Sequence, residues 1–497
     1  MRFATFSSDG RRYLHPESLP KIQRPSLSPF TSIAKLPDFD APPRDEHFRY
    51  STSLQRTLQG KLLLLNELPF SIEFIHTHYV RGYLGYMKSI VKLSDGYICQ
   101  RCGNEEQRLF SSFICARCGE DCTYCRKCII MGRVSECLPL VYWRHDEQAP
   151  IWTENRTLMN WEGELSPEQA KASQVVIDTI VKRGRQLVWA VCGAGKTELL
   201  FEGLAYAFEK GLCVCIATPR VDVVLELEPR LRSVFPTVRM TALYGGAARE
   251  VVECQLFIST THQLLRYRHA FDVVIVDEVD AFPYSYDPML AFAVERAKKK
   301  VAATILLTAT PDEELKRQVE AGSLSAIKIP IRYHRHPLPV PHFVWCGNWN
   351  KKLVRKCKLP NVVFKWCRKR MEHKQPFLLF VPSVIVAEQV KVILGVESVY
   401  AEDTDRKEKV EKFRRGEMKA LVTTTILERG VTIPRLNVAV LGSEHDIFTE
   451  SALVQIAGRV GRSADFPNGD VCFFHYGKTK AMVAARQHIL EMNESVR

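Results

Sequence analysis

The segment 190–197, with the sequence Ala-Val-Cys-Gly-Ala-Gly-Lys-Thr, most constrains what this chain can fold into. An apolar run, 187–191, leads into it, and residues 198–202 after it favour a helix. A strand, a loop of small residues and a helix in this order cradle phosphate, because backbone N–H groups and the helix N-terminus attract the anion. Ala190 replaces the usual first glycine, and alanine tolerates the turn. The segment therefore predicts a nucleotide-binding α/β domain.

Individual residues of this loop have distinct predicted roles toward a magnesium nucleotide. Lys196 is expected to reach the β- and γ-phosphates, and the hydroxyl of Thr197 is expected to bind Mg²⁺. The other residues assigned to the nucleotide site are Cys192, Gly193, Ala194, Gly195 and Glu198.

Acidic residues follow a second apolar run, 273–276, which is typical of a buried strand. In open α/β sheets the carboxyl ends of the strands line the ligand crevice. Asp277 is therefore expected to complete the Mg²⁺ site through water, and Glu278 to orient and deprotonate an attacking water. A solvated acidic turn after a core strand is the alternative interpretation.

Composition indicates a soluble protein that binds a polyanion. The chain has 497 residues, enough for two to four domains, and 46% of them are apolar. It shows neither an apolar run of 18 residues nor a signal peptide, so we expect a cytoplasmic protein. The net charge of +13 favours nucleic acid as the partner, with an anionic membrane surface as the alternative.

Composition also changes along the chain, and the changes suggest domain boundaries. Prolines crowd the beginning, where we expect a flexible tail. Two later regions alternate strand-like and helix-like segments, which predicts two α/β lobes with parallel sheets. A Pro/His-rich segment, 331–342, is expected to link them. The predicted parts are the tail 1–55, an N-terminal segment 56–95, a cysteine-rich module 96–140, lobe 1 at 150–335 and lobe 2 at 345–497.

Eight of the 16 cysteines lie between Cys99 and Cys137. In a cytoplasmic chain such clustering favours metal binding over disulfides. Two segments share the pattern Cys-x-x-Cys-Gly, which aims two thiolates at one ion, and four thiolates suit a closed, structural zinc site. The predicted ligands are Cys99, Cys102, Cys115 and Cys118. The alternates Cys122, Cys125, Cys128 and Cys137 are open to a second zinc, an iron–sulfur cluster or ordinary burial.

Ser166 and Pro167 are a typical helix start, with serine as N-cap and proline in the first turn. This helix would present Gln169, whose amide can both donate to and accept from an adenine edge. A capping pattern on an amphipathic helix is the alternative.

Small hydroxyl residues follow several of the predicted strands. They offer hydroxyls and backbone amides to a sugar–phosphate chain. The residues assigned to nucleic acid in lobe 1 are Thr218, Pro219, Arg220, Thr260 and Thr261. Residues 308–310, Thr-Ala-Thr, end a further strand and are expected to couple the nucleotide crevice to lobe 2.

In lobe 2, Arg459 and Arg462 lie three residues apart in a segment that we expect to be helical. Both can then point at one place, such as a γ-phosphate, where an arginine stabilises the charge of the transition state. Binding to a phosphate backbone, or a plain surface pair, is the alternative.

In their order and spacing, these motifs resemble those of superfamily 2 helicases and translocases, across residues 160–490. The resemblance implies two RecA-like lobes with ATP between them and a nucleic-acid strand across their tops. It also implies a nucleic-acid contact for Thr424 and a nucleotide contact for Gly430. Two departures are the box 277–280, Asp-Glu-Val-Asp, and Thr432, where many helicases have Asp.

A closer resemblance links the chain to the ComFA family of late-competence ATPases, which is similar to PriA-type helicases. Segments 125–133, 161–169 and 425–432 carry it, together with the cysteine cluster ahead of the motor. The resemblance implies ATP, Mg²⁺ and Zn²⁺ as cofactors and a translocase, stimulated by single-stranded DNA, that draws transforming DNA through a membrane channel.

The same resemblance implies a phosphoribosyltransferase-like partner of the ComFC type and at most a peripheral position at the inner face of the membrane. The sequence leaves a homo-oligomer open. Two other functions stay open as well: a duplex-unwinding helicase for replication restart or RNA, and a DNA-binding scaffold that nucleotide merely switches.

Overall fold

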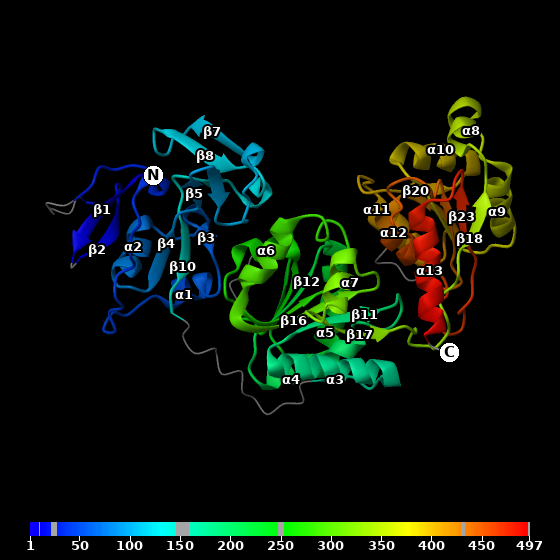
Figure 1. Cartoon of the computed structure of the whole chain (residues 1–497), viewed down its shortest axis with the longest axis horizontal. Coiled ribbons are helices and arrows are strands. Elements are labelled where there is room, and N and C mark those ends of the chain that lie inside the picture. Colours follow the sequence, from blue (N-terminus) through cyan, green and yellow to red (C-terminus); the bar gives the residue numbers. More distant parts are fainter. Residues whose placement is uncertain (9, 21–26, 146–158, 247–252, 429–432, 496–497) are drawn as a thin grey trace. The chain divides into compact units, whose positions relative to one another are not determined.

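The structure is a computed structural model that describes residues 1–497 except 9, 21–26, 146–158, 247–252, 429–432 and 496–497 (Figure 1). The chain divides into two compact units. The first contains residues 1–161, 179–184 and 204–304, and the second contains 162–178, 185–203 and 305–497.

The chain begins with an antiparallel hairpin of β1 (Phe3–Ser8) and β2 (Arg11–Pro16). Phe3 and Leu14 are fully buried, and the backbone N–H of Leu14 donates to the hydroxyl of Tyr79 at 3.1 Å. Our expectation that residues 1–55 form a flexible tail is therefore wrong for this hairpin. The prolines mostly lie between short elements, which apolar side chains still anchor.

Short strands and helices make up the rest of the region before residue 145. Small sheets have the orders β3-β10-β4, β5-β6 and β7-β8-β9. The helices are α1 (Thr52–Leu58) and α2 (Ile72–Val80), with 3₁₀ turns at Ile33–Lys35, Leu65–Glu67, Gln107–Leu109 and Ile129–Met131. The strands are β3 (Leu63–Leu64), β4 (Leu84–Met87), β5 (Ile90–Leu93), β6 (Gly96–Cys99), β7 (Phe110–Ile114), β8 (Asp121–Cys125), β9 (Val134–Ser135) and β10 (Leu140–Trp143).

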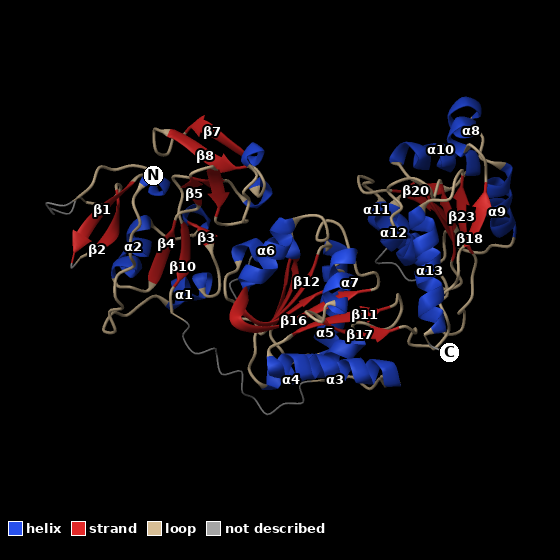
Figure 2. Cartoon of the chain, in the orientation of Figure 1, coloured by secondary structure: helices blue, strands red, loops and turns tan. Residues whose placement is uncertain are grey.

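A seven-stranded sheet of order β13-β14-β12-β15-β16-β11-β17 follows (Figure 2). Its strands are β11 (Arg185–Ala190), β12 (Val214–Thr218), β13 (Met240–Leu243), β14 (Leu256–Thr260), β15 (Phe271–Val276), β16 (Lys298–Thr308) and β17 (Ser325–Ile329). Its helices are α3 (Pro167–Lys182), α4 (Phe201–Glu209), α5 (Val221–Val234), α6 (Pro288–Ala297) and α7 (Glu313–Glu320), with 3₁₀ turns at Glu198–Leu200 and Thr261–Arg266. Strand β12 is buried along its whole length, as expected for a central strand of a parallel sheet.

The last part of the chain forms a six-stranded sheet of order β18-β23-β22-β19-β21-β20, in which every neighbouring pair is parallel. The strands are β18 (His342–Trp345), β19 (Phe377–Phe380), β20 (Glu397–Val399), β21 (Ala420–Thr423), β22 (Asn437–Leu441) and β23 (Val471–His475). The helices are α8 (Trp349–Lys356), α9 (Asn361–Glu372), α10 (Val384–Leu394), α11 (Arg406–Arg414), α12 (Glu450–Ala457) and α13 (Lys480–Glu494), with a 3₁₀ turn at Thr425–Leu427. Side chains of α8, α9 and α10 pack on the sheet in one core.

These two sheets confirm the predicted α/β class with two parallel-sheet lobes. Residues 330–341 form neither helix nor strand, in agreement with the predicted linker at 331–342. Among the described residues, no helix has both the length and the apolarity that a membrane span requires.

Candidate nucleotide site and cysteine centres

The predicted phosphate-binding loop joins the end of β11 to the 3₁₀ turn that begins at Glu198. Gly193 and Gly195 have φ angles of +84° and +70°, a region that favours glycine. A Cβ on Gly195 would also lie 2.3 Å from Nε2 of Gln169, so a larger residue would displace that amide. The glycines are thus needed for the shape of the loop. Lys196 and Thr197 follow it and are half-buried.

Gln169 holds the loop from the first turn of α3. Its backbone N–H donates to Oγ of Ser166 at 3.3 Å, and its Oε1 accepts from the backbone N–H of Ser166 at 2.9 Å, which forms a capping box. The helix start predicted at Ser166 and Pro167 is confirmed. Nε2 of Gln169 donates to the carbonyl oxygens of Ala194 at 3.0 Å and Gly195 at 3.4 Å, and only 4% of the residue is exposed. Its amide braces the loop here, and its contact with adenine stays a prediction.

The predicted acidic pair lies directly after β15, and both residues are half-buried. The backbone N–H of Asp277 donates to the carbonyl oxygen of Ala217 at 2.8 Å, which continues the parallel pairing with β12. Glu278 has a φ of +56°, and its N–H donates to Oδ1 of Asp277 at 2.9 Å. A non-glycine residue in this region costs about 1–2 kcal/mol, and such strain concentrates at functional sites.

Arg459 and Arg462 lie in a loop and not on a helix, so that part of our prediction is wrong. Helix α12 ends at Ala457, and the chain then turns at Gly461, whose φ is +70°. Arg459 is 1% exposed, and its Nε donates to the carbonyl oxygen of Glu428 at 2.8 Å. Nε of Arg462 donates to the carbonyl oxygen of Gly458 at 3.1 Å. The turn over residues 458–461 ends the helix that we expected to carry both arginines.

The phosphate-binding loop contacts the segment that carries these arginines. Sγ of Cys192 donates to Oε1 of Gln455 at 3.0 Å. A Cβ on Gly458 would lie 2.5 Å from Cβ of Cys192, so the backbone of Gly458 packs directly against the cysteine side chain. Thr310 and Ser451 make a second link, with 2.8 Å between their hydroxyl oxygens. All of these residues belong to the second compact unit.

Arg332 is a residue of this site that we did not predict. It is fully buried, and its guanidinium donates to the carbonyl oxygens of Gly461 at 2.6 Å and Gly458 at 3.4 Å. Burial lowers the pKa of Arg332 to about 10, so it stays charged at neutral pH. The next residue donates its backbone N–H to the carbonyl oxygen of Gly193 at 3.1 Å. Its segment looked like a linker, and nothing in the local sequence pointed to these long-range contacts.

The residues predicted to contact nucleic acid lie at strand ends. Thr218 ends β12, Pro219 follows it, and Arg220 forms an ion pair with Asp222 at 2.7 Å. Thr260 and Thr261, at the end of β14, are buried. Thr424 precedes a 3₁₀ turn. Gly430 and Thr432 lie outside the described residues.

The eight clustered cysteines form two groups of four, and the grouping differs from our prediction. One group is Cys99, Cys102, Cys125 and Cys128, and the other is Cys115, Cys118, Cys122 and Cys137. The two Cys-x-x-Cys-Gly segments therefore belong to different groups, whereas we had assigned both to one zinc ion.

The geometry of strand β8 explains this division. Successive side chains of a strand point to opposite faces, so residues three apart lie on opposite sides. Cys122 and Cys125 are three apart on β8. The spacing that suggested one ladder therefore separates the thiols into two sites.

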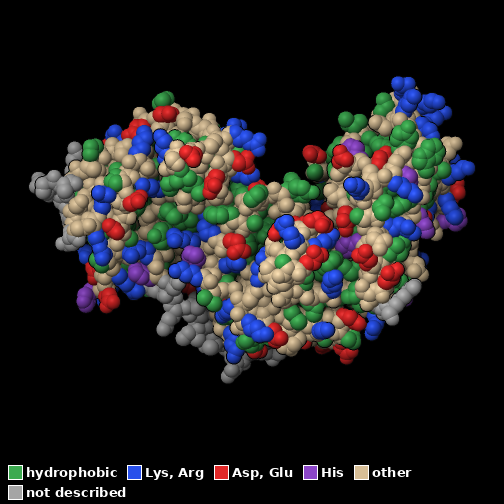
Figure 3. Space-filling view, viewed as in Figure 1, with side chains coloured by type: hydrophobic (Ala, Val, Ile, Leu, Met, Phe, Trp, Pro, Cys, Tyr) green, Lys and Arg blue, Asp and Glu red, His purple; other side chains and the backbone are tan. Residues whose placement is uncertain are grey.

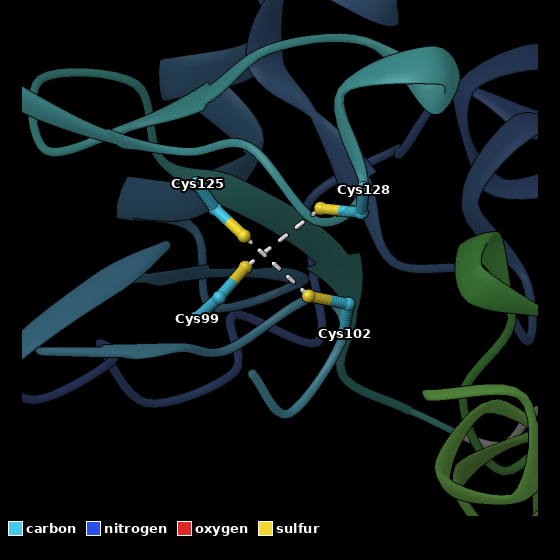
Figure 4. Close-up of side chains that lie close together, drawn as sticks. All are labelled: Cys99, Cys102, Cys125 and Cys128. Atoms are coloured by element: carbon cyan, nitrogen blue, oxygen red, sulfur yellow. Dashed lines mark hydrogen bonds between the residues drawn. The ribbon is translucent and has the colours of Figure 1, made fainter. Parts of the chain in front are cut away.

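Sulfur distances in the first group suit one tetrahedral ion (Figure 4). Sγ of Cys99 lies 3.9 Å from Sγ of Cys128, and Sγ of Cys102 lies 3.7 Å from Sγ of Cys125. Thiolates about 2.3 Å from zinc at tetrahedral angles are about 3.8 Å apart, whereas a disulfide needs about 2.05 Å. The donor set and its spacing therefore fit a closed zinc site.

Arg101 is a second residue that we did not predict, and it lies beside this group. It is fully buried, and its guanidinium donates to the carbonyl oxygen of Cys128 at 2.8 Å and to its Sγ at 3.3 Å. An ion with four thiolates carries excess negative charge, which a neighbouring guanidinium offsets.

Comparisons with known proteins agree with this architecture. Three family models match: the competence protein ComFA N-terminal domain at residues 45–142, the type III restriction enzyme res subunit at 162–313 and the helicase conserved C-terminal domain at 358–464. The competence protein ComFA of Bacillus subtilis is 50% identical over 457 residues, which cover 91% of this chain and 97% of the relative. That of Streptococcus pneumoniae is 39% identical and covers 75% of this chain and 86% of the relative.

A solved structure of yeast Dbp5 bound to RNA and ADP BeF3 is 15% identical, with a TM-score of 0.49, and covers 67% of this chain and 93% of that chain. This similarity is too low to bear on the fold, which the two sheets define.

Proposed function

Because the chain belongs to the ComFA family of competence proteins, we propose that it is an ATP-driven translocase that moves single-stranded DNA during DNA uptake. Its helicase-type domains make it an ATP-hydrolysing enzyme that uses Mg²⁺. The contact of Cys192 with Gln455 carries the proposal, because it joins the phosphate-binding loop to the arginine-bearing segment of lobe 2. Hydrolysis in the loop can then move lobe 2.

The proposed catalytic roles belong to residues that follow two strands, β11 and β15. Lys196 neutralises the β- and γ-phosphates, and Thr197 with Asp277 holds Mg²⁺. Glu278 orients the attacking water and takes its proton. The strained backbone of Glu278 supports this role, because the surrounding structure has to hold the carboxylate in that conformation.

Arg459 and Arg462 supply positive charge from lobe 2 to the γ-phosphate in the transition state. Arg332 acts beside them as a positioning residue, because it binds the backbone of their loop while the next residue binds Gly193. Loss of the γ-phosphate would release the loop, and each cycle would shift the grip of the lobes on the strand.

A positively charged surface supports the nucleic-acid partner. Figure 3 shows lysine and arginine side chains gathered over α8, which carries Lys351, Lys352, Arg355 and Lys356. Such a surface binds phosphates without regard to sequence, and its affinity falls steeply with salt. Thr218, Thr260, Thr261 and Thr424 would add contacts to the sugar–phosphate chain, through backbone amides where their side chains are buried.

We further propose that Cys99, Cys102, Cys125 and Cys128 bind zinc and that the module 96–140 serves the nucleic acid or a partner of the ComFC type. Zinc would hold the ends of β6 and β8 together in this module, and Arg101 would balance the charge of the thiolates. The two lobes are proposed to comprise residues 150–335 and 345–497.

Steady-state ATP hydrolysis without nucleic acid and with single-stranded DNA, duplex DNA and RNA tests the proposal. We expect single-stranded DNA to stimulate hydrolysis most. Equal rates in all four conditions would contradict translocation and favour a nucleotide-switched scaffold. Displacement of a paired strand, measured in a separate strand-displacement assay, would favour the duplex-unwinding alternative.

A further inference from the structure

We infer that Cys115, Cys118, Cys122 and Cys137 bind a second structural zinc ion, which holds the segment 31–36 on the cysteine-rich module. This inference concerns the architecture of the N-terminal region and does not depend on the proposed motor function.

The four thiols form a site of the right size. All four Sγ atoms lie within 4.8 Å of one another, and those of Cys115 and Cys137 are 3.7 Å apart. This distance matches the roughly 3.8 Å that separates tetrahedral thiolates on one zinc ion. An iron–sulfur cluster is less suitable, because several iron atoms would spread the ligands further apart. Four thiolates fill a tetrahedral site and leave no position for water, and all four cysteines are buried, so the ion would be structural.

The local backbone repeats that of the first site. In each Cys-x-x-Cys-Gly segment the glycine has a positive φ, +69° at Gly103 and +71° at Gly119. In each, the glycine N–H donates 2.8 Å to the carbonyl oxygen of the first cysteine. Since the two turns are alike and lie in separate groups, each would nucleate its own metal site.

Residues within this second site hold the preceding segment. Glu120, between Cys118 and Cys122, accepts from Nζ of Lys35 at 2.7 Å and from Oγ1 of Thr31 at 3.1 Å. Glu136, next to Cys137, accepts from the backbone N–H of Ala34 at 3.1 Å through its carbonyl oxygen. The ion would thus fix both glutamates where they meet the segment.

The segment in turn carries the hairpin at the start of the chain. Phe3 and Thr31 exchange backbone hydrogen bonds of 2.8 and 3.0 Å, and Ile33 is fully buried. Loss of the second ion should therefore loosen the hairpin β1–β2 while the first site remains intact.

Zinc content and hydrogen exchange of the full-length chain test this inference. We expect two zinc ions in the wild type, and one in each of the double variants Cys115→Ser/Cys118→Ser and Cys99→Ser/Cys102→Ser. Local opening should speed amide exchange in residues 3–8 and 31–36 by at least about tenfold, in the first variant only. Glu120→Gln changes the side chain that binds Lys35 but removes no thiol, so it should keep both ions. A wild type with one zinc, or two ions left after Cys115→Ser/Cys118→Ser, would overturn the site, and unchanged exchange would overturn its anchoring role.

If the Cys115→Ser/Cys118→Ser variant does not fold, cobalt substitution of the wild type decides. The tetrathiolate absorption should rise until two equivalents of Co²⁺ are bound. Saturation at one equivalent would reject the second site.

Discussion

Sγ of Cys192 donates a 3.0 Å hydrogen bond to Oε1 of Gln455, although 262 residues lie between them. Gln455 is buried on α12, three residues before Gly458, which packs against the same cysteine. The phosphate-binding loop is therefore in direct contact with the segment that leads into the arginine-bearing loop of lobe 2. A movement of one can be transmitted to the other through this contact, without involving the linker.

Replacing Lys196 with alanine should lower kcat for ATP by about 10²–10³, because one preorganised positive charge on the transferring phosphate is lost. Binding of single-stranded DNA without nucleotide should be unchanged. Coupled ATPase assays and fluorescence anisotropy measure the two effects. Lys182→Ala, on the exposed end of α3, is the matched control. Normal turnover in Lys196→Ala would exclude the proposed chemistry.

Glu278→Gln should remove the general base and lower single-turnover hydrolysis by about 10²–10⁴ while ATP still binds. Glu278→Gly should be equally inactive but at least as stable, because relief of the left-handed strain offsets the entropy of glycine. Quench-flow and thermal unfolding report the two effects. A large loss of melting temperature in Glu278→Gly would contradict the strain argument.

Arg462→Lys should reduce kcat by at least about 10², since lysine keeps the charge but lacks the planar fork of an arginine finger. Its melting temperature should fall less than that of Arg459→Lys, because Arg462 is only half-buried and water can replace its hydrogen bond to Gly458. Arg459→Lys should lower both kcat and melting temperature, since it loses a buried hydrogen bond to Glu428. Steady-state kinetics with calorimetry separate these outcomes, and an active Arg462→Lys would remove this residue from the mechanism.

Arg332→Met should lower the free energy of unfolding by about 3 kcal/mol, because two buried carbonyl oxygens lose a charged donor. It should also reduce stimulation by single-stranded DNA more than basal hydrolysis. Arg335→Met, three residues away and largely exposed, is the control. Denaturant unfolding and ATPase assays measure both effects. Equal behaviour of the two variants would argue against a coupling role.

Acid should weaken lobe 2 through Glu450, which accepts a 3.1 Å hydrogen bond from Nδ1 of His488. This hydrogen bond lowers the pKa of Glu450 below its usual value. A carboxyl with a lowered folded pKa contributes stability above its unfolded pKa, about 4.3, and loses it as pH falls through the folded value. Between pH 6 and pH 3 the free energy of unfolding should therefore decrease less in Glu450→Gln than in the wild type or the control Glu494→Gln. The difference should be up to about 1 kcal/mol, and thermal melting at each pH measures it. Parallel curves would contradict this.

Local sequence was sufficient for many elements. Runs of apolar residues such as 273–276 became central strands, because burial on both faces of a parallel sheet requires continuous apolar sequence. Gly193 and Gly195 were correctly placed in a tight loop, since their φ angles disfavour other residues. Ser166 caps α3 as its hydroxyl chemistry predicts.

Errors arose where a local pattern had more than one solution. The helical spacing of Arg459 and Arg462 did not reveal that the chain turns after Gly458. The prolines before residue 55 hid the apolar residues that anchor the first hairpin.

The sequence by itself determined the two α/β lobes, the phosphate-binding loop and the Cys-x-x-Cys-Gly turns that are typical of metal sites. Each of these depends on residues that are close together in the chain. Only the tertiary structure decided which cysteines share a site and that Arg332 binds the backbone of the arginine-bearing loop. Those outcomes depend on the face to which β8 turns each thiol and on contacts between residues far apart in the chain, and neither leaves a periodic trace in the sequence.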